Sequence, residues 1–230
     1  MSTSTLTGTV LAQVADPARP LLTYYNERTG ERTELSAATL GNWAAKIGNY
    51  LRDETMAAPG DPVRVDLPEH WQSAAVLLGA WWAGLQVQTA DGTAGTVFTS
   101  ADRLDDHPDA ETVVVLPLDP FAMGSPSLPI GIDDFGTVVR PHGDQFQPAG
   151  AGAQALDELS VDQVLAAATA AAAADGIVAG ARVLSTRPWT SGEQVITGLL
   201  APLLTGAALV WVDGADDARL AAIAATEKTD

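Results

Sequence analysis

Hydrophobic and polar residues follow a regular order in the segment Pro59–Thr89. After a Pro-Gly turn, apolar residues alternate over Val63–Leu67, which predicts a strand with one wetter face. A strongly apolar stretch over Glu69–Ala83 predicts a helix, and Gly84 is a natural residue to end it. Leu85–Thr89 then resumes an extended pattern. The segment therefore predicts one β-α-β unit.

Similar patterns predict elements on both sides of this unit. The predicted strands are Leu21–Tyr25, Thr33–Leu35, Thr96–Thr99, Thr112–Leu116, Arg182–Ser185 and Ala207–Val212. The predicted helices are Leu6–Asp16, Ala37–Glu54 with Ser36 as N-cap, Val161–Asp175 with Ser160 as N-cap, Gly192–Leu204 and Asp216–Glu227. Strands that alternate with helices indicate an α/β protein of layered, mostly parallel sheets flanked by helices.

Proline and glycine are dense between Pro117 and Gly152, so we expect a long irregular connection here, with a hairpin around Thr137–Phe146. The predicted organisation is a single domain over residues 1–230. Within it, sub-regions 1–116 and 156–230 are joined by the Pro/Gly-rich stretch 117–155.

Composition narrows the classes of function. Hydrophobic residues make up 47% of the chain, enough for a substantial core. With 12 basic and 29 acidic residues the net charge is −17, and the basic residues are scattered, which argues against binding to nucleic acids or anionic membranes. The absence of cysteine excludes disulfides and thiolate chemistry. Because neither a signal-peptide pattern nor a long apolar run occurs, we expect a cytoplasmic protein.

Several short phrases occur in an order that is typical of one enzyme family. They are Leu22-Thr23-Tyr24, Thr33-Glu34-Leu35-Ser36, Pro59-Gly60-Asp61-x-Val63, Leu77–Gly84, Arg182-Val183-Leu184-Ser185 with Pro188, and Leu199–Gly206 leading into Ala207–Val212. In this order the chain resembles the N-terminal part of the adenylate-forming (AMP-binding, acyl-CoA synthetase-like) enzymes. The resemblance implies their fold, in a shortened form, and the ancestry of an ATP-using enzyme.

The phosphate-binding loop of that family departs most from the pattern. In the family a Ser/Thr/Gly-rich loop that ends in lysine holds the ATP phosphates, and the resemblance places it between Leu116 and Ser160. That interval has no lysine and is rich in proline, which lacks an N–H donor. Thr190-Ser191-Gly192 has suitable residues but lies later in the chain, and the acidic Glu193 follows. We interpret it as the N-cap of a helix.

Other candidate chemistry is sparse. The histidines are His70, His107 and His142, and no pair has the spacing of a helical metal site. Acidic residues cluster around His107. They could form a site for a divalent ion or a solvated loop, and we favour the solvated loop. Asp133 and Asp134 are adjacent and should point in opposite directions. We therefore predict no catalytic residue, no metal site and no cofactor, and name His142, Trp189 and Glu193 as the candidates for contact with a ligand.

Three hypotheses follow. The favoured one is a non-catalytic protein that acts through assembly, as a homo-oligomer or with a protein partner. Its candidate anchors are Trp81, Trp82, Trp189 and Trp211. The second is a module that binds a small acyl or nucleotide ligand at the carboxyl ends of the strands. The third is a working acyl-adenylating ligase. A shift of the melting temperature with nucleotides or acyl-CoA would favour the second over the first.

Overall fold

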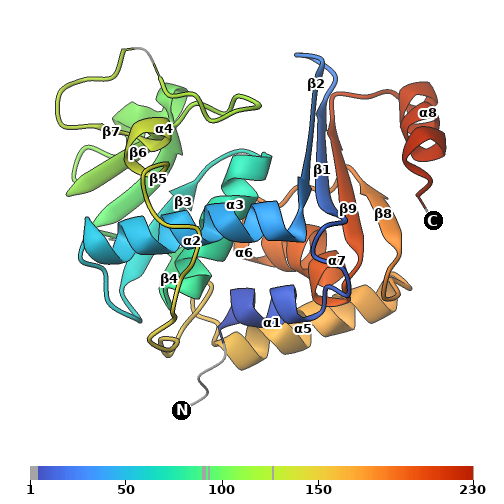
Figure 1. Ribbon diagram of the computed structural model, residues 1–230, viewed down its shortest axis with the longest axis horizontal. Helices are drawn as coiled ribbons and strands as arrows, with labels where there is room; N and C mark the ends of the chain where they lie inside the picture. Colours follow the sequence, from blue (N-terminus) through green and yellow to red (C-terminus); the bar gives the residue numbers. More distant parts are fainter. Residues whose placement is uncertain (1–4, 90–91, 93, 126, 230) are drawn as a thin grey trace.

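Two β-sheets form the frame of the protein (Figure 1). The computed structural model describes residues 5–89, 92, 94–125 and 127–229. The first sheet has the strand order β2-β1-β9-β8 and the second β4-β3-β5-β6-β7. The strands are β1 (Pro20–Asn26), β2 (Glu31–Ser36), β3 (Pro62–Asp66), β4 (Gln86–Gln88), β5 (Thr96–Ser100), β6 (Thr112–Leu116), β7 (Asp133–Asp134), β8 (Arg182–Ser185) and β9 (Ala208–Asp213). All pairs are parallel except β1 with β2, so the predicted mostly parallel α/β fold is confirmed.

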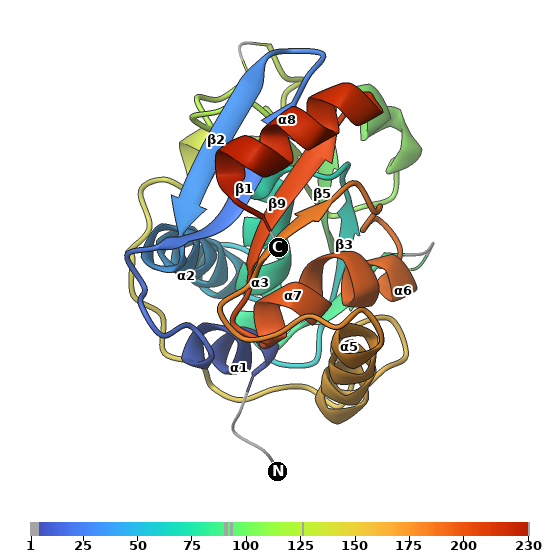
Figure 2. The same ribbon diagram turned by 90° about the vertical axis from the view of Figure 1, so that its right-hand side faces the viewer.

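Helices fill the space between the sheets and cover the first sheet. They are α1 (Leu6–Ala12), α2 (Ala37–Asp53), α3 (Trp71–Trp82), the 3₁₀ helix η1 (Ala101–Asp106), α4 (Phe135–Val138), α5 (Val161–Ala174), α6 (Gly192–Gln194), the π-helix η2 (Val195–Leu200), α7 (Ala201–Leu204) and α8 (Asp217–Glu227). Helices α2 and α3 pack on each other between the sheets, α2 against β1 and β2, and α3 against β3 and β4. Helix α8 lies on the outer face of the first sheet (Figure 2).

The predicted β-α-β unit is present as β3, α3 and β4, with β3 and β4 parallel. The ring of His70 caps the start of α3, since its Nδ1 accepts a hydrogen bond from the Gln72 N–H at 3.2 Å. Every residue of α3 before Trp82 is buried, as expected for a helix that is apolar on all sides. Gly84 adopts a left-handed φ of +80° directly after the helix, so the predicted glycine stop is also confirmed.

Four glycines lie close together where this unit meets the Pro/Gly-rich stretch. The carbonyl of Gly84 accepts hydrogen bonds from the N–H groups of Gly60 (2.9 Å) and Gly152 (3.0 Å). A Cβ atom on Gly152 would lie 2.4 Å from the Gly60 Cα, and one on Gly84 would lie 2.2 Å from the Gly150 oxygen. Only glycine fits backbones this close. The stretch before α5 is thus fixed against the β-α-β unit.

Two elements differ from the prediction. The expected hairpin around Thr137–Phe146 is wrong: the chain forms β7, parallel to β6, and then the short helix α4. The side chain of Phe146 packs against Trp82 at a ring distance of 6.0 Å. The helix expected over Gly192–Leu204 is divided into α6, η2 and α7. Pro202, which has no N–H, follows the π-helical turn and interrupts regular helix hydrogen bonding.

Candidate functional site

The segment before α5 lies in the interval where the family resemblance places the phosphate-binding loop. Its backbone N–H groups donate inside the protein: Gly152 to the Gly84 carbonyl (3.0 Å), Ala155 to Leu159 (2.7 Å) and Asp157 to Val87 (2.7 Å). A phosphate-binding loop needs such groups to point at the ligand. In this protein they hold the segment against the end of α3 and strand β4.

The side chain of Asp157 adds negative charge beside this segment. Its carboxylate accepts hydrogen bonds from the N–H of Thr89 (2.8 Å) and from the Thr89 hydroxyl (3.0 Å). It also lies against Gly192 at the start of α6, where a Cβ atom would come within 2.2 Å of Asp157 Oδ2. Ser191 is the N-cap of α6, as predicted, and Glu193 lies in its first turn. Two carboxylates at this position oppose the binding of a triphosphate.

The chain has two lysines, Lys46 and Lys228, and both make contacts away from the segment before α5. The Lys46 ammonium donates to the carbonyls of His142 (2.6 Å) and Arg140 (3.2 Å) and pairs with Asp144 at 2.6 Å. It therefore ties the loop after α4 to helix α2. Lys228 forms the left-handed C-cap of α8.

The structure places His142 at a different pocket from Trp189. His142 contacts the ring of Tyr50 edge-on at 5.9 Å and lines a pocket of about 430 Å³ together with Glu54 and Asp133. Trp189 is buried against Trp211, and Glu193 is exposed on α6. The pocket that His142 lines includes neither of the other two residues. His142 and Trp189 therefore line different pockets.

The space beside Trp189 is also small. The pocket that Trp189 lines with Val65, Leu67 and Leu77 has a volume of about 10 Å³, no more than one water molecule requires. The backbone N–H of Trp189 donates to the Glu69 carboxylate at 3.0 Å. An acyl chain would need this wall to move.

The prediction that tryptophans anchor a partner surface is wrong for three of the four. Trp81, Trp189 and Trp211 are buried, with relative exposures of 2%, 3% and 5%. The indole N–H of Trp81 donates to the Ala155 carbonyl and that of Trp211 to the Arg187 carbonyl, each at 2.8 Å. These three residues therefore pack inside the protein and are not available to a partner. Trp82 is half-buried and packs against Phe146.

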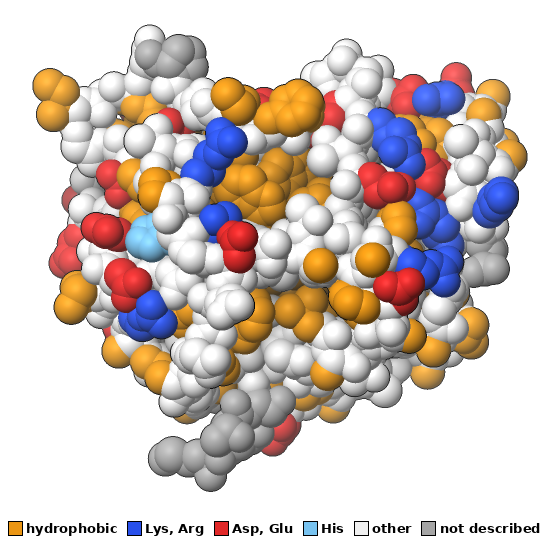
Figure 3. Space-filling model, viewed as in Figure 1, with side chains coloured by type: hydrophobic (Ala, Val, Ile, Leu, Met, Phe, Trp, Pro, Cys, Tyr) orange, Lys and Arg blue, Asp and Glu red, His pale blue; other side chains and the backbone are white. Residues whose placement is uncertain are grey.

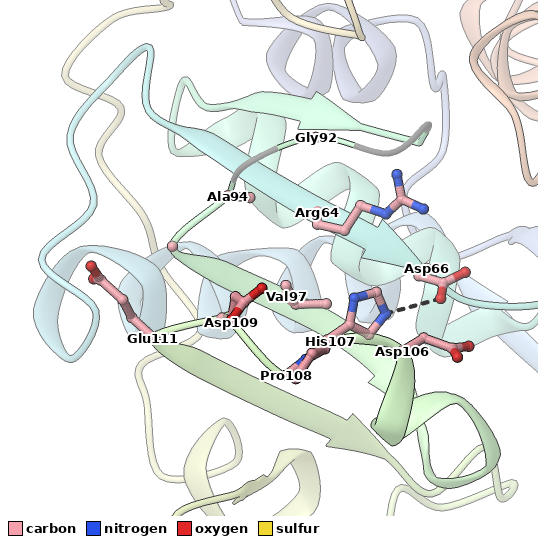
Figure 4. Close-up of a pocket in the computed structure, with 12 residues that line it drawn as sticks. Arg64, Asp66, Gly92, Ala94, Val97, Asp106, His107, Pro108, Asp109 and Glu111 are labelled. Carbon is pink, nitrogen blue, oxygen red and sulfur yellow. Dashed lines mark hydrogen bonds and ion pairs between the residues drawn. The ribbon is translucent and has the colours of Figure 1, made fainter.

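A further pocket lies on the face of the second sheet opposite α3 and has a volume of about 610 Å³ (Figure 4). At its floor the Asp66 carboxylate accepts hydrogen bonds from Arg103 (2.8 Å) and His107 (3.0 Å). Sequence reasoning did not assign Arg64 and Asp66 to a site. The signal was their alternation in β3, which puts both on one sheet face.

The described part of the chain holds no group of three or more His, Asp or Glu side chains arranged to bind a metal ion. Asp133 and Asp134 point to different partners, as expected: Asp133 accepts from the Tyr50 hydroxyl, and Asp134 from Thr137, each at 2.6 Å. Among the described residues, no helix has the length and apolar character needed to cross a membrane.

Comparisons with known proteins place this geometry in context. The chain is 47% identical to a Mycobacterium tuberculosis (strain ATCC 25618 / H37Rv) protein named TIGR03089 family protein, over 98% of this chain and 96% of that protein. No protein-family model matches the chain.

Solved structures share the fold at low sequence identity. A Brucella canis acyl-CoA synthetase superposes with a TM-score of 0.77 at 20% identity, over 97% of this chain and 46% of its own. MatB from Rhodopseudomonas palustris gives 0.75 at 15% identity (97% and 48%), and a benzoate CoA ligase from Burkholderia xenovorans LB400 gives 0.69 at 15% (96% and 47%). The chain thus spans about half the length of these enzymes and has the fold of adenylate-forming ligases. By its identity to the mycobacterial protein, it belongs to the TIGR03089 family.

Proposed function

We propose that this protein is a non-catalytic relative of the adenylate-forming enzymes and acts by assembly with a second copy of itself. The backbone N–H groups of the segment before α5 donate to carbonyls within the protein, and the Asp157 carboxylate adds negative charge there. Both observations support a protein that does not bind ATP. The surface for assembly is the uncharged segment, by which we mean residues 120–132; it carries no charged side chain. As part of the same proposal we place the protein in the cytoplasm.

Exposed apolar side chains of the uncharged segment carry this proposal. Phe121, Met123 and Ile130 have relative exposures of 73%, 65% and 105%. Residues 120–125 and 127–132 lie along the margin of the lobe that contains β7 and α4 (Figure 1), and Figure 3 shows hydrophobic side chains projecting from this margin. Contiguous apolar surface is typical of interaction sites, and three large exposed apolar side chains within one short segment favour this one.

Residues 120–125, the first part of the uncharged segment, are held in place by hydrogen bonds. The Asp119 carboxylate accepts from the N–H groups of Phe121 (2.7 Å) and Met123 (2.9 Å). The Gln72 side chain donates to the Asp119 carbonyl at 2.7 Å, and Asp134 accepts from the Ser125 N–H at 3.0 Å. A pre-ordered surface loses little conformational entropy on binding.

Net charge favours contact between copies at this segment. Two chains of charge −17 repel each other, and the repulsion is smallest where the meeting surfaces carry no charge. A symmetric dimer would place the same segment of both chains in one interface.

The alternative, a module for a small acyl or nucleotide ligand at His142, Trp189 and Glu193, is less well supported because His142 and Trp189 line different pockets and the pocket at Trp189 holds only about 10 Å³. An acyl-adenylating ligase would further require phosphate contacts from a segment whose donors are used.

We expect sedimentation velocity to show a dimer over roughly 1 to 100 µM protein. Changing Phe121, Met123 and Ile130 together to serine should weaken the dimer by at least about 100-fold, since each buried side chain contributes roughly 1.5–3 kcal/mol. Met56 and Val178 are exposed apolar residues outside the uncharged segment. The matched control changes both to serine and should leave association unchanged.

A wild-type monomer across this range would contradict assembly with a second copy. Equal weakening by the control would mean that association is unspecific rather than located at the uncharged segment. A different protein could bind the wild type and the control but not the triple variant. That result would mean that the uncharged segment binds a heterologous partner and not a second copy of this chain.

A further inference from the structure

The pocket on the second sheet is built around His107. It lies between β3, β5 and the chain that follows η1 (Figure 4). Its volume of about 610 Å³ is within the range of roughly 300–1,000 Å³ that is usual for small-molecule sites. None of the residues that line it is in the uncharged segment.

Asp66 fixes the orientation of the His107 ring. The Nε2 atom of His107 lies 3.0 Å from Asp66 Oδ2, and Arg103 holds the other carboxylate oxygen at 2.8 Å. The His107 side chain is only 12% exposed. In the tautomer whose Nε2–H donates to Asp66, Nδ1 is a hydrogen-bond acceptor, and Figure 4 shows this nitrogen facing the pocket.

Arg64 brings positive charge to the opposite wall. It lies in the middle of β3 and is buried, with a relative exposure of 9%. Figure 4 shows its side chain extending from β3 above the His107 ring, and both residues line the pocket. A guanidinium has five N–H donors, so it can bind a ligand carboxylate and keep a protein partner.

The walls of the pocket therefore differ in charge. Arg64 lies on the β3 side, and His107 with the carboxylates of Asp106, Asp109 and Glu111 lies on the side of η1 and the chain that follows it. Between them, the apolar side chains of Ala94 and Val97 line the pocket. A ligand that matches this arrangement has a negative group, a short apolar body and a positive group.

We propose that this pocket binds a small zwitterion, a molecule with one carboxylate and one ammonium group. The carboxylate contacts Arg64, and the ammonium donates to His107 Nδ1 and Asp109. This binding is separate from assembly through the uncharged segment and does not depend on it.

Isothermal titration calorimetry with three probes of matched size tests the proposal. The probes are 4-aminobutanoate, butylamine and butanoate. We expect 4-aminobutanoate to bind with a saturable Kd of roughly 10–1,000 µM and each singly charged probe to bind at least about tenfold more weakly. His107→Phe and Asp109→Asn should each weaken 4-aminobutanoate by about tenfold or more. The control is Asp102→Asn, which changes an acidic residue of η1 that does not line the pocket, and it should bind like the wild type.

No binding of 4-aminobutanoate, or equal binding of butylamine, would overturn the proposal. An equal loss of affinity in the Asp102 control would also overturn it, since binding would then follow overall charge. If the His107 variant does not fold, NMR of the ring ¹⁵N atoms of His107 in the wild-type protein tests the contact with the ligand instead. The Nδ1 signal should shift on titration with 4-aminobutanoate, and an unchanged signal would contradict the contact.

Discussion

Replacing Gly84 by alanine should lower the free energy of unfolding by about 3 kcal/mol or more. The φ of +80° at Gly84 costs alanine about 1 kcal/mol. The new Cβ would lie 2.2 Å from the Gly150 carbonyl oxygen, and relieving such an overlap in a packed region costs roughly 1–3 kcal/mol. Backbone movement here would also weaken the hydrogen bonds from Gly60 and Gly152. Urea unfolding followed by tryptophan fluorescence measures the loss.

Gly30→Ala is the matched control for backbone strain alone. Gly30 has a similar φ of +75°, and no atom would lie within 4 Å of its Cβ. We expect this variant to lose only about 1 kcal/mol. Equal losses in the two variants would mean that the close approach of Gly84 to the segment before α5 carries no energy.

The second large effect concerns Glu227, which holds α8 to the first sheet (Figure 2). Burial alone would raise the pKa of this carboxyl group. Hydrogen bonds from Tyr25, Arg182 and Arg32 outweigh it and lower the pKa from 4.5 to about 2. A change of this size corresponds to about 3 kcal/mol. Glu227→Gln should therefore lower the free energy of unfolding by about 3 kcal/mol at pH 7.

The same pKa sets the pH dependence of this contribution. The folded-state pKa lies below the unfolded-state value, so the stabilisation is fully present above about pH 4.5 and is lost as the pH falls towards 2. Urea unfolding of wild type and Glu227→Gln should give curves that converge over this range. Glu193→Gln, at an exposed position, should change stability by no more than about 0.5 kcal/mol at any pH. A difference between wild type and Glu227→Gln that persists unchanged at pH 2 would contradict the assignment.

Local patterns were sufficient to predict most of the fold. Alternation, apolar runs and caps identified the β3-α3-β4 unit, and Ser36 and Ser160 are N-caps as predicted. The structure of 133–146 could not be predicted in this way because distant contacts decide it. Asp133, for example, is held by the Tyr50 hydroxyl at 2.6 Å. Similarly, nothing local to Trp81 or Trp211 indicates that each donates to a distant backbone carbonyl.

The candidate pocket shows the same limit. The alternation of Arg64 and Asp66 was visible in the sequence, and so was the acidic loop around His107. Their meeting depends on the crossover from β5 to β6, which brings His107 back to Asp66 across the sheet face. The side chains of one site thus come from separate segments, and only the tertiary structure joins them.

We propose that this chain, which has the fold of adenylate-forming enzymes, does not bind ATP. Titration of the protein with magnesium-ATP in a calorimeter tests it most directly. Since the Gly152 and Asp157 N–H groups are used internally and the Asp157 carboxylate lies beside α6, we predict no saturable binding up to about 5 mM ATP. Saturable binding with a Kd below about 1 mM would contradict the claim.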